Sequence, residues 1–170
     1  MKFAKTVQGI PQVGIGYDVH RFGKKRRLIL GGVRIAYHRG LLGHSDADVL
    51  LHALCDALLG AASLGDIGKH FPNTSRKYKN ISSLVLLKHV GKMLKAKRFV
   101  IIHLDSTLVL QEPEILPYVP KMQRNIARTL GIARSQVSIK ATTNERLGFV
   151  GRGEGCAALA LATVLADGAR

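Results

Sequence analysis

GLLGHSDADVLLHALCDALLGAASLGDIGKHFP, residues 40–72, contains the clearest helix signal of the chain. Ser45 can cap a helix, and Asp48 stands three positions later, where an acidic side chain completes a capping box. Acidic residues in the first turn also suit the positive end of the helix dipole. The helix is predicted to run through VLLHALCDALL and to end at Gly60 or near Gly65.

Outward from this helix, strand and helix signals alternate along the chain. A second helix is predicted from Ser82 or Ser83, and a third follows the prolines at 117 and 120 and ends at Gly131. Residues 12–19 and 27–35 predict strands in a hairpin-like pair, and residues 98–110 and 136–142 predict two more strands. The last apolar run, CAALALATVLA, fits either a helix or a strand. The order predicts an α/β or α+β domain.

Length and composition indicate one globular domain over residues 1–170, with residues 1–12 as a flexible extension. Apolar residues make up 46% and charged residues 22%, which excludes a wholly disordered protein. The longest apolar run is far shorter than the roughly 20 residues that a membrane span needs. The first residues lack the apolar segment of a secretory signal, so we expect a cytoplasmic protein. Cys55 and Cys156 lie in apolar stretches and are expected to be buried thiols.

The net charge of +15, from 26 Lys and Arg against 11 Asp and Glu, is the unusual feature of the composition. Such a balance attracts anions, including nucleic acid, acidic lipid and phosphorylated small molecules. Aromatic residues are only 5%, Trp is absent, and the densest basic run is the four residues 24–27. Nucleic acid is therefore disfavoured as a partner.

The triplet Asp18-Val19-His20 places a carboxylate and an imidazole two residues apart at the end of a predicted strand. Residues i and i+2 of a strand share a face, so both side chains would project together while Val19 points into the core. With His52 they form a ligand set for a divalent metal such as zinc, and three ligands leave one position open for chemistry. The alternative is a surface polar pair and an unrelated core histidine.

Asp48, His52 and Asp56 follow each other at intervals of four, which puts them on one stripe of the helix. Burying this stripe without partners would be costly, and a metal on His52 would satisfy it. Asp56 or Asp48 would then orient the imidazole. A stripe that faces solvent explains the same spacing.

Three further segments have the polar residues of a ligand site. The start of the helix after His44 and Ser45 offers backbone N–H groups to an anion. The turn-rich segment 65–75 suits a ligand. The segment 141–155 has four glycines and many donors that can grip phosphate, and Glu145 within it could hold Mg²⁺. An ordinary connecting loop is the alternative reading of each segment.

Several long motifs in register make the chain resemble the 2-C-methyl-D-erythritol 2,4-cyclodiphosphate synthase family. They are GYDVHRF, LGGVRI, GLLGHSDADVLLHALCDALLGAASLGDIGKHFP and KATTNERLGFVGRGEG. The resemblance covers nearly the whole chain from about Gly14. It implies an α/β sandwich, with one mixed sheet packed against helices, that assembles as a homotrimer around a central axis. It also implies that the last apolar run is a strand.

The activity that the resemblance implies is a phosphorus–oxygen lyase reaction of the non-mevalonate isoprenoid pathway. The 2-phosphate of 4-diphosphocytidyl-2-C-methyl-D-erythritol 2-phosphate attacks the β-phosphate of the same molecule, which forms a cyclic diphosphate and expels CMP. Zn²⁺, or another divalent cation, would be held by Asp18, His20 and His52. Glu145 would bind Mg²⁺ or Mn²⁺, and His44 and Thr143 would position the phosphates and stabilise the transition state.

The resemblance further implies a set of substrate contacts in sites between subunits. In the order of the chain, these residues are Ser45, Asp66, Ile67, Gly68, Phe71, Pro72, Asn73, Thr74, Ser75, Leu110, Leu116, Thr142 and Asn144. Two more, Phe149 and Arg152, match residues near the trimer axis, where a cavity can hold an isoprenoid diphosphate.

The sequence departs from the family pattern at a few of these positions. Asn73 and Ser75 are neutral in a loop where the family usually has acidic residues. Glu114 stands where Lys is common, and its carboxylate would repel a diphosphate. Asn144 replaces a third Thr, which is a mild change. These departures bear on substrate affinity rather than on the type of reaction.

Three other functions fit parts of the sequence. A zinc phosphohydrolase would use the same ligands with water as the nucleophile. A basic RNA-binding protein would bind RNA in a salt-dependent way without zinc. An isoprenoid-diphosphate-binding protein without catalysis would depend on Phe149 and Arg152 but not on Asp18 or His52.

Overall fold

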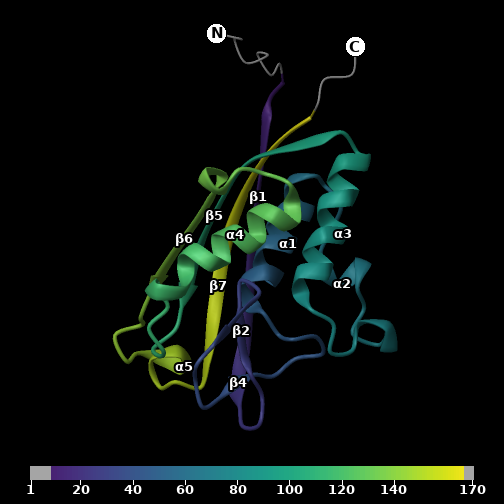
Figure 1. Cartoon of the computed structure of the whole chain (residues 1–170). Helices are drawn as coiled ribbons and strands as arrows, with labels where there is room; N and C mark the ends of the chain where they lie inside the picture. Colours follow the sequence, from purple (N-terminus) through teal and green to yellow (C-terminus); the bar gives the residue numbers. More distant parts are fainter. Residues whose placement is uncertain (1–8, 167–170) are drawn as a thin grey trace.

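A computed structural model describes residues 9–166 of the chain and consists of a five-stranded sheet with helices on one of its faces (Figure 1). The strands are β1 (Pro11–Gly23), β2 (Leu28–Leu30), β3 (Val33–Ile35), β4 (Gly40–Leu41), β5 (Phe99–Val109), β6 (Val137–Thr142) and β7 (Gly155–Ala166). The α-helices are α1 (Val49–Ala61), α2 (Ile67–His70), α3 (Ser83–Ala96), α4 (Val119–Leu130) and α5 (Gly148–Gly151). Single 3₁₀ turns cover Arg76–Tyr78, Leu116–Tyr118 and Arg134–Gln136.

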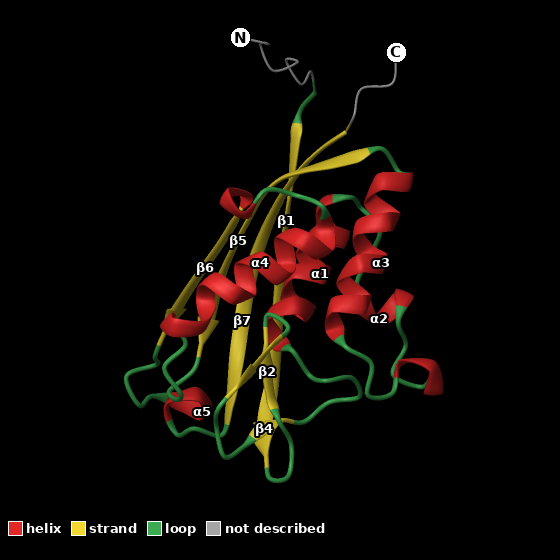
Figure 2. Ribbon diagram, in the orientation of Figure 1, coloured by secondary structure: helices red, strands yellow, loops and turns green. Residues whose placement is uncertain are grey.

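The main sheet has the strand order β4-β1-β7-β5-β6 and is mixed, as expected. β1, β7 and β5 pair in antiparallel fashion, whereas β5 and β6 run parallel. A register shift interrupts the β5–β7 pairing between Ile101 and His103. Helices α1, α3 and α4 lie together in front of the sheet in the view of Figure 2. The fold is thus a two-layer α/β sandwich.

Helix α1 packs directly on the backbone of β1 because β1 has glycine where the two elements meet. A Cβ atom on Gly14 would collide with the carbonyl oxygen of Ala57, and one on Gly16 would collide with that of Ala53. Ten residues of α1 are buried, which makes it the centre of the hydrophobic core. This close approach brings the middle of the helix over the polar end of β1.

Two sequence predictions about the strands need correction. Residues 28–30 and 33–35 form a hairpin with each other, whereas β1 pairs with β7 and with the short β4. Val19 does not point into the core: its side chain is 43% exposed, on the face of the sheet away from the helices. Side chains alternate between the two faces along a strand, so Asp18 and His20, on either side of Val19, point to the helix-covered face instead.

The first helix also begins later than predicted. Asp48 is its N-cap and accepts the N–H of Leu51, so Ser45 lies outside the helix. Asp48 is fully buried and also accepts the N–H groups of Gly31 and Gly32. Burial and the charge of Asp46 raise the pKa of Asp48 to about 7, against the effect of these three donors. Because Asp48 occupies the N-terminus of α1, this end of the helix is not the free anion site that the sequence predicted.

The remaining predictions for the elements are confirmed. The second helix begins at Ser83, the third ends before Gly131, and the strand signals at 98–110 and 136–142 correspond to β5 and β6. The ambiguous run is strand β7, as the family resemblance implied. Cys55 and Cys156 are buried free thiols. Residues 11 and 12 of the predicted extension belong to β1, and residues 1–8 lie outside the described part.

The face of the sheet opposite the helices carries large apolar side chains that remain exposed in the single chain. They are Val13, Ile15, Tyr17, Val19, Val100, Ile102, Leu159 and Leu161. A contiguous apolar patch of this kind marks an interaction surface. None of the helices between residues 9 and 166 is both long enough and apolar enough to cross a membrane.

Candidate metal centre and phosphate-binding cavity

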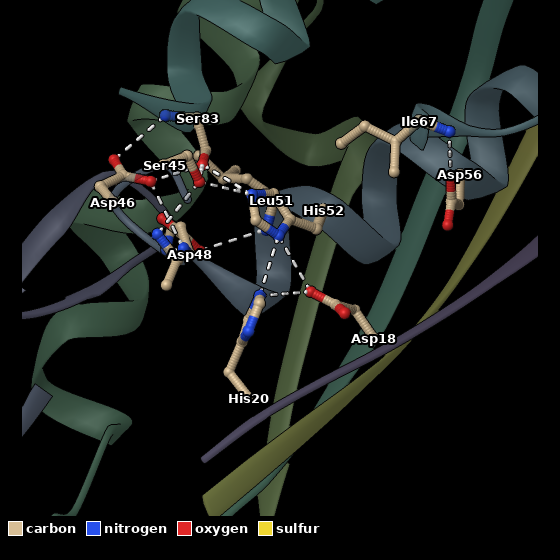
Figure 3. Close-up of polar contacts among 12 residues, drawn as sticks. Asp18, His20, Ser45, Asp46, Asp48, Leu51, His52, Asp56, Ile67 and Ser83 are labelled. Atoms are coloured by element: carbon tan, nitrogen blue, oxygen red, sulfur yellow. Dashed lines mark hydrogen bonds and ion pairs between the residues drawn. The ribbon is translucent and has the colours of Figure 1, made fainter. Parts of the chain in front are cut away.

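Asp18, His20 and His52 bring three potential metal ligands to one point on the helix-covered side of β1 (Figure 3). Asp18 Oδ2 lies 3.0 Å from His20 Nε2 and 3.0 Å from His52 Nδ1. The two histidine nitrogens are 3.1 Å apart. Three ligand atoms around a tetrahedral zinc ion lie about 3.3 Å from one another, given bonds of about 2 Å. This triangle therefore fits a divalent cation with little rearrangement.

The local sequence explains why these atoms meet. Asp18 and His20 are two residues apart in β1, and His52 comes from the second turn of α1, which rests on the glycines of the same strand. The side chains are 24%, 18% and 13% exposed, respectively. The site is thus shielded but not closed, as a centre that binds a reactant requires.

Charge–charge contacts shift the acid–base properties of the triad. Burial alone would raise the pKa of Asp18, but hydrogen bonds and charge from His20 and His52 outweigh it and hold this pKa well below its usual range. Burial alone would lower the pKa of His52, but the hydrogen bond and charge of Asp18 outweigh it and raise this pKa above 6.5. Asp18 therefore favours the protonated form of His52, and a metal ion at Nδ1 competes with that proton.

Metal binding is accordingly expected to weaken as the pH falls through the raised pKa of His52. Below that pKa the proton competes for Nδ1, and one displaced proton costs about a tenfold loss of affinity per pH unit. Competition of the protein with a chromophoric zinc chelator, from about pH 5.5 to about pH 8.5, measures this dependence. The loss should begin above the ordinary histidine value of 6.5. A profile that stays flat until well below 6.5 would show that Asp18 does not raise the pKa of His52.

The other nitrogen of His52, Nε2, faces two serine hydroxyls, and no spacing in the sequence connects these serines with the ring. Nε2 lies 3.0 Å from Ser83 Oγ and 3.1 Å from Ser45 Oγ. Neither Asp48 nor Asp56 hydrogen-bonds this ring, contrary to the prediction. Asp48 is engaged as the N-cap of α1, and Asp56 accepts the N–H of Ile67 at 2.7 Å. The only signal for Ser83 was its position at the start of a predicted helix.

A cavity of ≈ 210 Å³ opens beside the triad. Besides the three ligands, several residues predicted to bind substrate line it, namely His44, Ser45, Ile67, Gly68, Phe71 and Asn73. His44 Nε2 lies 3.0 Å from the carbonyl oxygen of Ser75, which fixes the ring at the rim. Asp66 instead caps α2 by accepting the N–H of Lys69, at 2.8 Å. Pro72 and Thr74 belong to the same exposed loop but do not line the cavity.

A second cavity, of ≈ 300 Å³, lies at the other edge of the sheet, where β5 and β6 end. Leu110, Leu116, Thr142 and Thr143 line it, and so does Glu114. Thr143 Oγ1 donates to Glu145 Oε1 at 2.8 Å. Strands β7 and β5 lie between β1 and β6. Thr143, Glu145 and the residues of the second cavity therefore do not reach the triad within one chain.

Phe149 and Arg152, which the family resemblance placed near the trimer axis, lie in or next to the short helix α5. Phe149 is 37% exposed, and Arg152 pairs with Glu154 at 2.7 Å on the surface. Asn144, in the loop before α5, donates to the carbonyl oxygen of Leu147. None of these three residues lines the cavity beside the triad.

Comparison with known sequences finds the same family that the sequence motifs indicated, and the match extends along nearly the whole chain. The family model described as the YgbB family matches residues 11–165. The 2-C-methyl-D-erythritol 2,4-cyclodiphosphate synthase of Alkaliphilus metalliredigens is 62% identical over 153 residues, which cover 90% of this chain and 96% of the relative. The synthase of the same name from Syntrophomonas wolfei is 58% identical over 153 residues, with 90% and 98% covered.

Solved structures have the same fold. The bifunctional IspDF from Campylobacter jejuni superposes with a TM-score of 0.90 at 43% identity. That match covers 94% of this chain but only 43% of the Campylobacter chain. IspF from Plasmodium falciparum, solved as a CDP complex, has a TM-score of 0.82 at 29% identity, with 95% and 99% of the two chains covered. By its sequence, its fold and its Asp-His-His cluster, this chain belongs to the YgbB family of 2-C-methyl-D-erythritol 2,4-cyclodiphosphate synthases.

Proposed function

We propose that the chain converts 4-diphosphocytidyl-2-C-methyl-D-erythritol 2-phosphate to 2-C-methyl-D-erythritol 2,4-cyclodiphosphate and CMP. The oxygen of the 2-phosphate attacks the β-phosphorus, a new P–O bond closes the ring, and the bond from the β-phosphorus to the oxygen shared with the α-phosphate breaks. CMP leaves with that oxygen and its electron pair. The observation that carries the proposal is the Asp18–His20–His52 triangle in the lining of the cavity of ≈ 210 Å³.

The chain's own residues supply binding and orientation rather than a nucleophile. Asp18, His20 and His52 would hold Zn²⁺ or another divalent cation, which supplies a Lewis acid for a phosphate oxygen when bound. His44, at the cavity rim, offers an imidazole to the phosphates. Because the reaction is intramolecular, holding the attacking oxygen in line with the leaving group is the main requirement.

The second half of the site is proposed to come from a neighbouring subunit of a homotrimer. Thr143 and Glu145 would then face the metal centre of the next subunit, Glu145 holding Mg²⁺ or Mn²⁺. Leu110, Leu116 and Thr142 would form the pocket for the cytidine moiety. Two observations support this arrangement: the exposed apolar face of the sheet needs a partner, and the cavity at β5 and β6 lies away from the triad.

The reaction is tested by ³¹P NMR of the purified protein with the cytidyl substrate, Zn²⁺ and Mg²⁺. We expect cyclic diphosphate and CMP in equal amounts. Linear phosphate products would indicate a zinc phosphohydrolase instead. If the metal is bound and the trimer intact but nothing turns over, the departures at Asn73, Ser75 and Glu114 become disabling and the proposal fails.

Replacing Glu145 with glutamine is expected to leave the zinc content unchanged and to raise the concentration of Mg²⁺ needed for half-maximal rate about tenfold or more. Glutamine keeps the shape but loses the charge that a hard cation prefers. Rates measured across a Mg²⁺ series, together with metal analysis, provide the test. Glu112→Gln, which removes the same charge between the cavity-lining residues Gln111 and Pro113, is the control for the loss of charge alone. An unchanged Mg²⁺ dependence in Glu145→Gln would remove Glu145 from this role.

A further inference from the structure

On the side of the His52 ring that faces away from the metal site, Nε2 contacts a chain of polar groups formed by the buried Ser83 and the half-buried Asp46 (Figure 3). We propose that Ser83 and Asp46 are positioning residues that keep the proton of the His52 ring on Nε2, so that the lone pair of Nδ1 is available to the metal. This inference rests on the proposed metal centre but not on the reaction that takes place there.

The direction of each hydrogen bond follows from Asp46. Its carboxylate accepts twice from Ser83, from the backbone N–H at 3.0 Å and from the hydroxyl. A serine hydroxyl has one hydrogen. Because that hydrogen goes to Asp46, Ser83 Oγ offers only lone pairs to His52. At a separation of 3.0 Å, Nε2 must therefore be the donor.

Ser45, the other hydroxyl near Nε2, does not fix this direction. Its oxygen accepts the N–H of Ala47 at 3.1 Å, and it lies 3.4 Å from Ser83 Oγ and 3.1 Å from Nε2. Its hydrogen can turn toward Ser83 or toward the ring, so Ser45 suits either tautomer. The hydrogen bond from Ser83 to Asp46 is therefore what makes Nε2 of His52 the donor.

The structure holds both residues firmly. Ser83 is the first residue of α3 and has no exposed surface. Asp46 lies in the loop before α1, where its N–H donates to the carbonyl oxygen of Ile81 at 3.0 Å. The chain of groups thus joins the beginnings of two helices, and His52 from α1 docks against it. A metal-binding histidine is oriented and made more basic when its second nitrogen donates to a fixed acceptor.

The test compares zinc affinity in two variants. In Ser83→Ala the hydroxyl is lost, but the backbone N–H that Asp46 accepts is kept. In Asp46→Asn the size is kept, but the amide group can donate to Ser83 Oγ, which lets the serine hydroxyl donate to Nε2 and reverses the chain. We expect the dissociation constant for Zn²⁺ to rise about 10-fold to 100-fold in each variant. Ser82→Ala is the matched control, because Ser82 is exposed and makes no side-chain capping bond.

A second readout reports the proton itself. In ¹⁵N-histidine-labelled, zinc-loaded protein, we expect the Nε2–H proton of His52 to exchange slowly in the wild type and in Ser82→Ala. In Ser83→Ala and Asp46→Asn this signal should be lost or exchange faster. Circular dichroism checks the fold, and the near-isosteric Asp46→Asn keeps the test valid if Ser83→Ala does not fold.

The outcomes separate this inference from the proposed function. Zinc binding within about twofold of wild type in both variants, with the Nε2–H signal retained, would overturn it. Unfolding at lower urea with unchanged zinc affinity would also overturn it, because it would show a purely structural role. Weakened zinc binding in a protein whose wild type forms no cyclic product would support the inference and contradict the reaction instead.

Discussion

Replacing His52 with alanine is expected to abolish cyclodiphosphate formation and to leave the purified protein with little bound zinc. The substitution removes one of three ligand atoms from a triangle with sides of 3.0–3.1 Å and leaves Asp18 and His20 as an incomplete site. Metal-ion stabilisation of transition-state charge is worth several kcal/mol, and each 1.36 kcal/mol is a tenfold change in rate. A rate loss of about 10³-fold or more should follow, measured by ³¹P NMR with metal analysis of the same sample.

His38→Ala is the matched control for that experiment. His38 is an exposed histidine that does not line the cavity beside the triad, so its removal should leave the zinc content and the rate unchanged. Circular dichroism and urea unfolding show whether His52→Ala keeps its fold after Ser45 and Ser83 lose their partner. Wild-type zinc content and turnover in His52→Ala would show that the ligand assignment is wrong.

The sequence predicted that Asp18 and His20 lie together because this part of the geometry is local. Residues i and i+2 of a strand point to the same face in any fold, and this rule places the side chains of Asp18 and His20 together. The arrival of His52 depended on the packing of α1 against β1, which periodicity does not show. The resemblance to the family supplied that information, and in the structure the three potential ligand atoms lie within 4.8 Å of one another.

The error about Val19 has an instructive physical cause. The rule that apolar side chains face the core assumes that only one face of the sheet is apolar. In β1 the alternation is reversed, since the helix-covered face holds Gly14, Gly16 and the two polar ligands, while the other face holds the large apolar side chains. The pattern fits the homotrimer proposed above, in which the second face of the strand would contact another subunit. The periodicity of a single chain does not reveal such a contact.

The partners of His52 were also beyond the sequence, for a different reason. Asp48 and Asp56 share its helix stripe, and spacing alone favours them as neighbours. Asp48 is drawn instead to the N–H groups of Gly31, Gly32 and Leu51, and this leaves the ring to Ser83 from another helix. Such competition between backbone donors and a side chain is decided only once the tertiary structure brings the candidates together.

Replacing Gly16 with alanine is expected to lower the free energy of unfolding by about 3 kcal/mol and to weaken zinc binding as well. The added Cβ would collide with the backbone carbonyl of Ala53, which cannot rotate away as a side chain can. Helix α1 must then lift from β1, and His52, one residue before Ala53, moves with it. Urea unfolding at a fixed protein concentration and zinc titration measure the two effects.

Gly60→Ala provides the matched control within the same helix. Gly60 is exposed, and the nearest atom to an added Cβ is Ile15 O at 4.0 Å, so the methyl group has room. Alanine favours a helix over glycine by about 1 kcal/mol, and this variant should be as stable as the wild type or slightly more so, with unchanged zinc affinity. Both substitutions add one methyl group. A loss of stability and zinc affinity in Gly16→Ala alone would therefore be caused by the close approach of α1 to β1. Equal stability and equal zinc affinity in the two variants would mean that the helix does not need the bare backbone of β1 to deliver His52 to the metal.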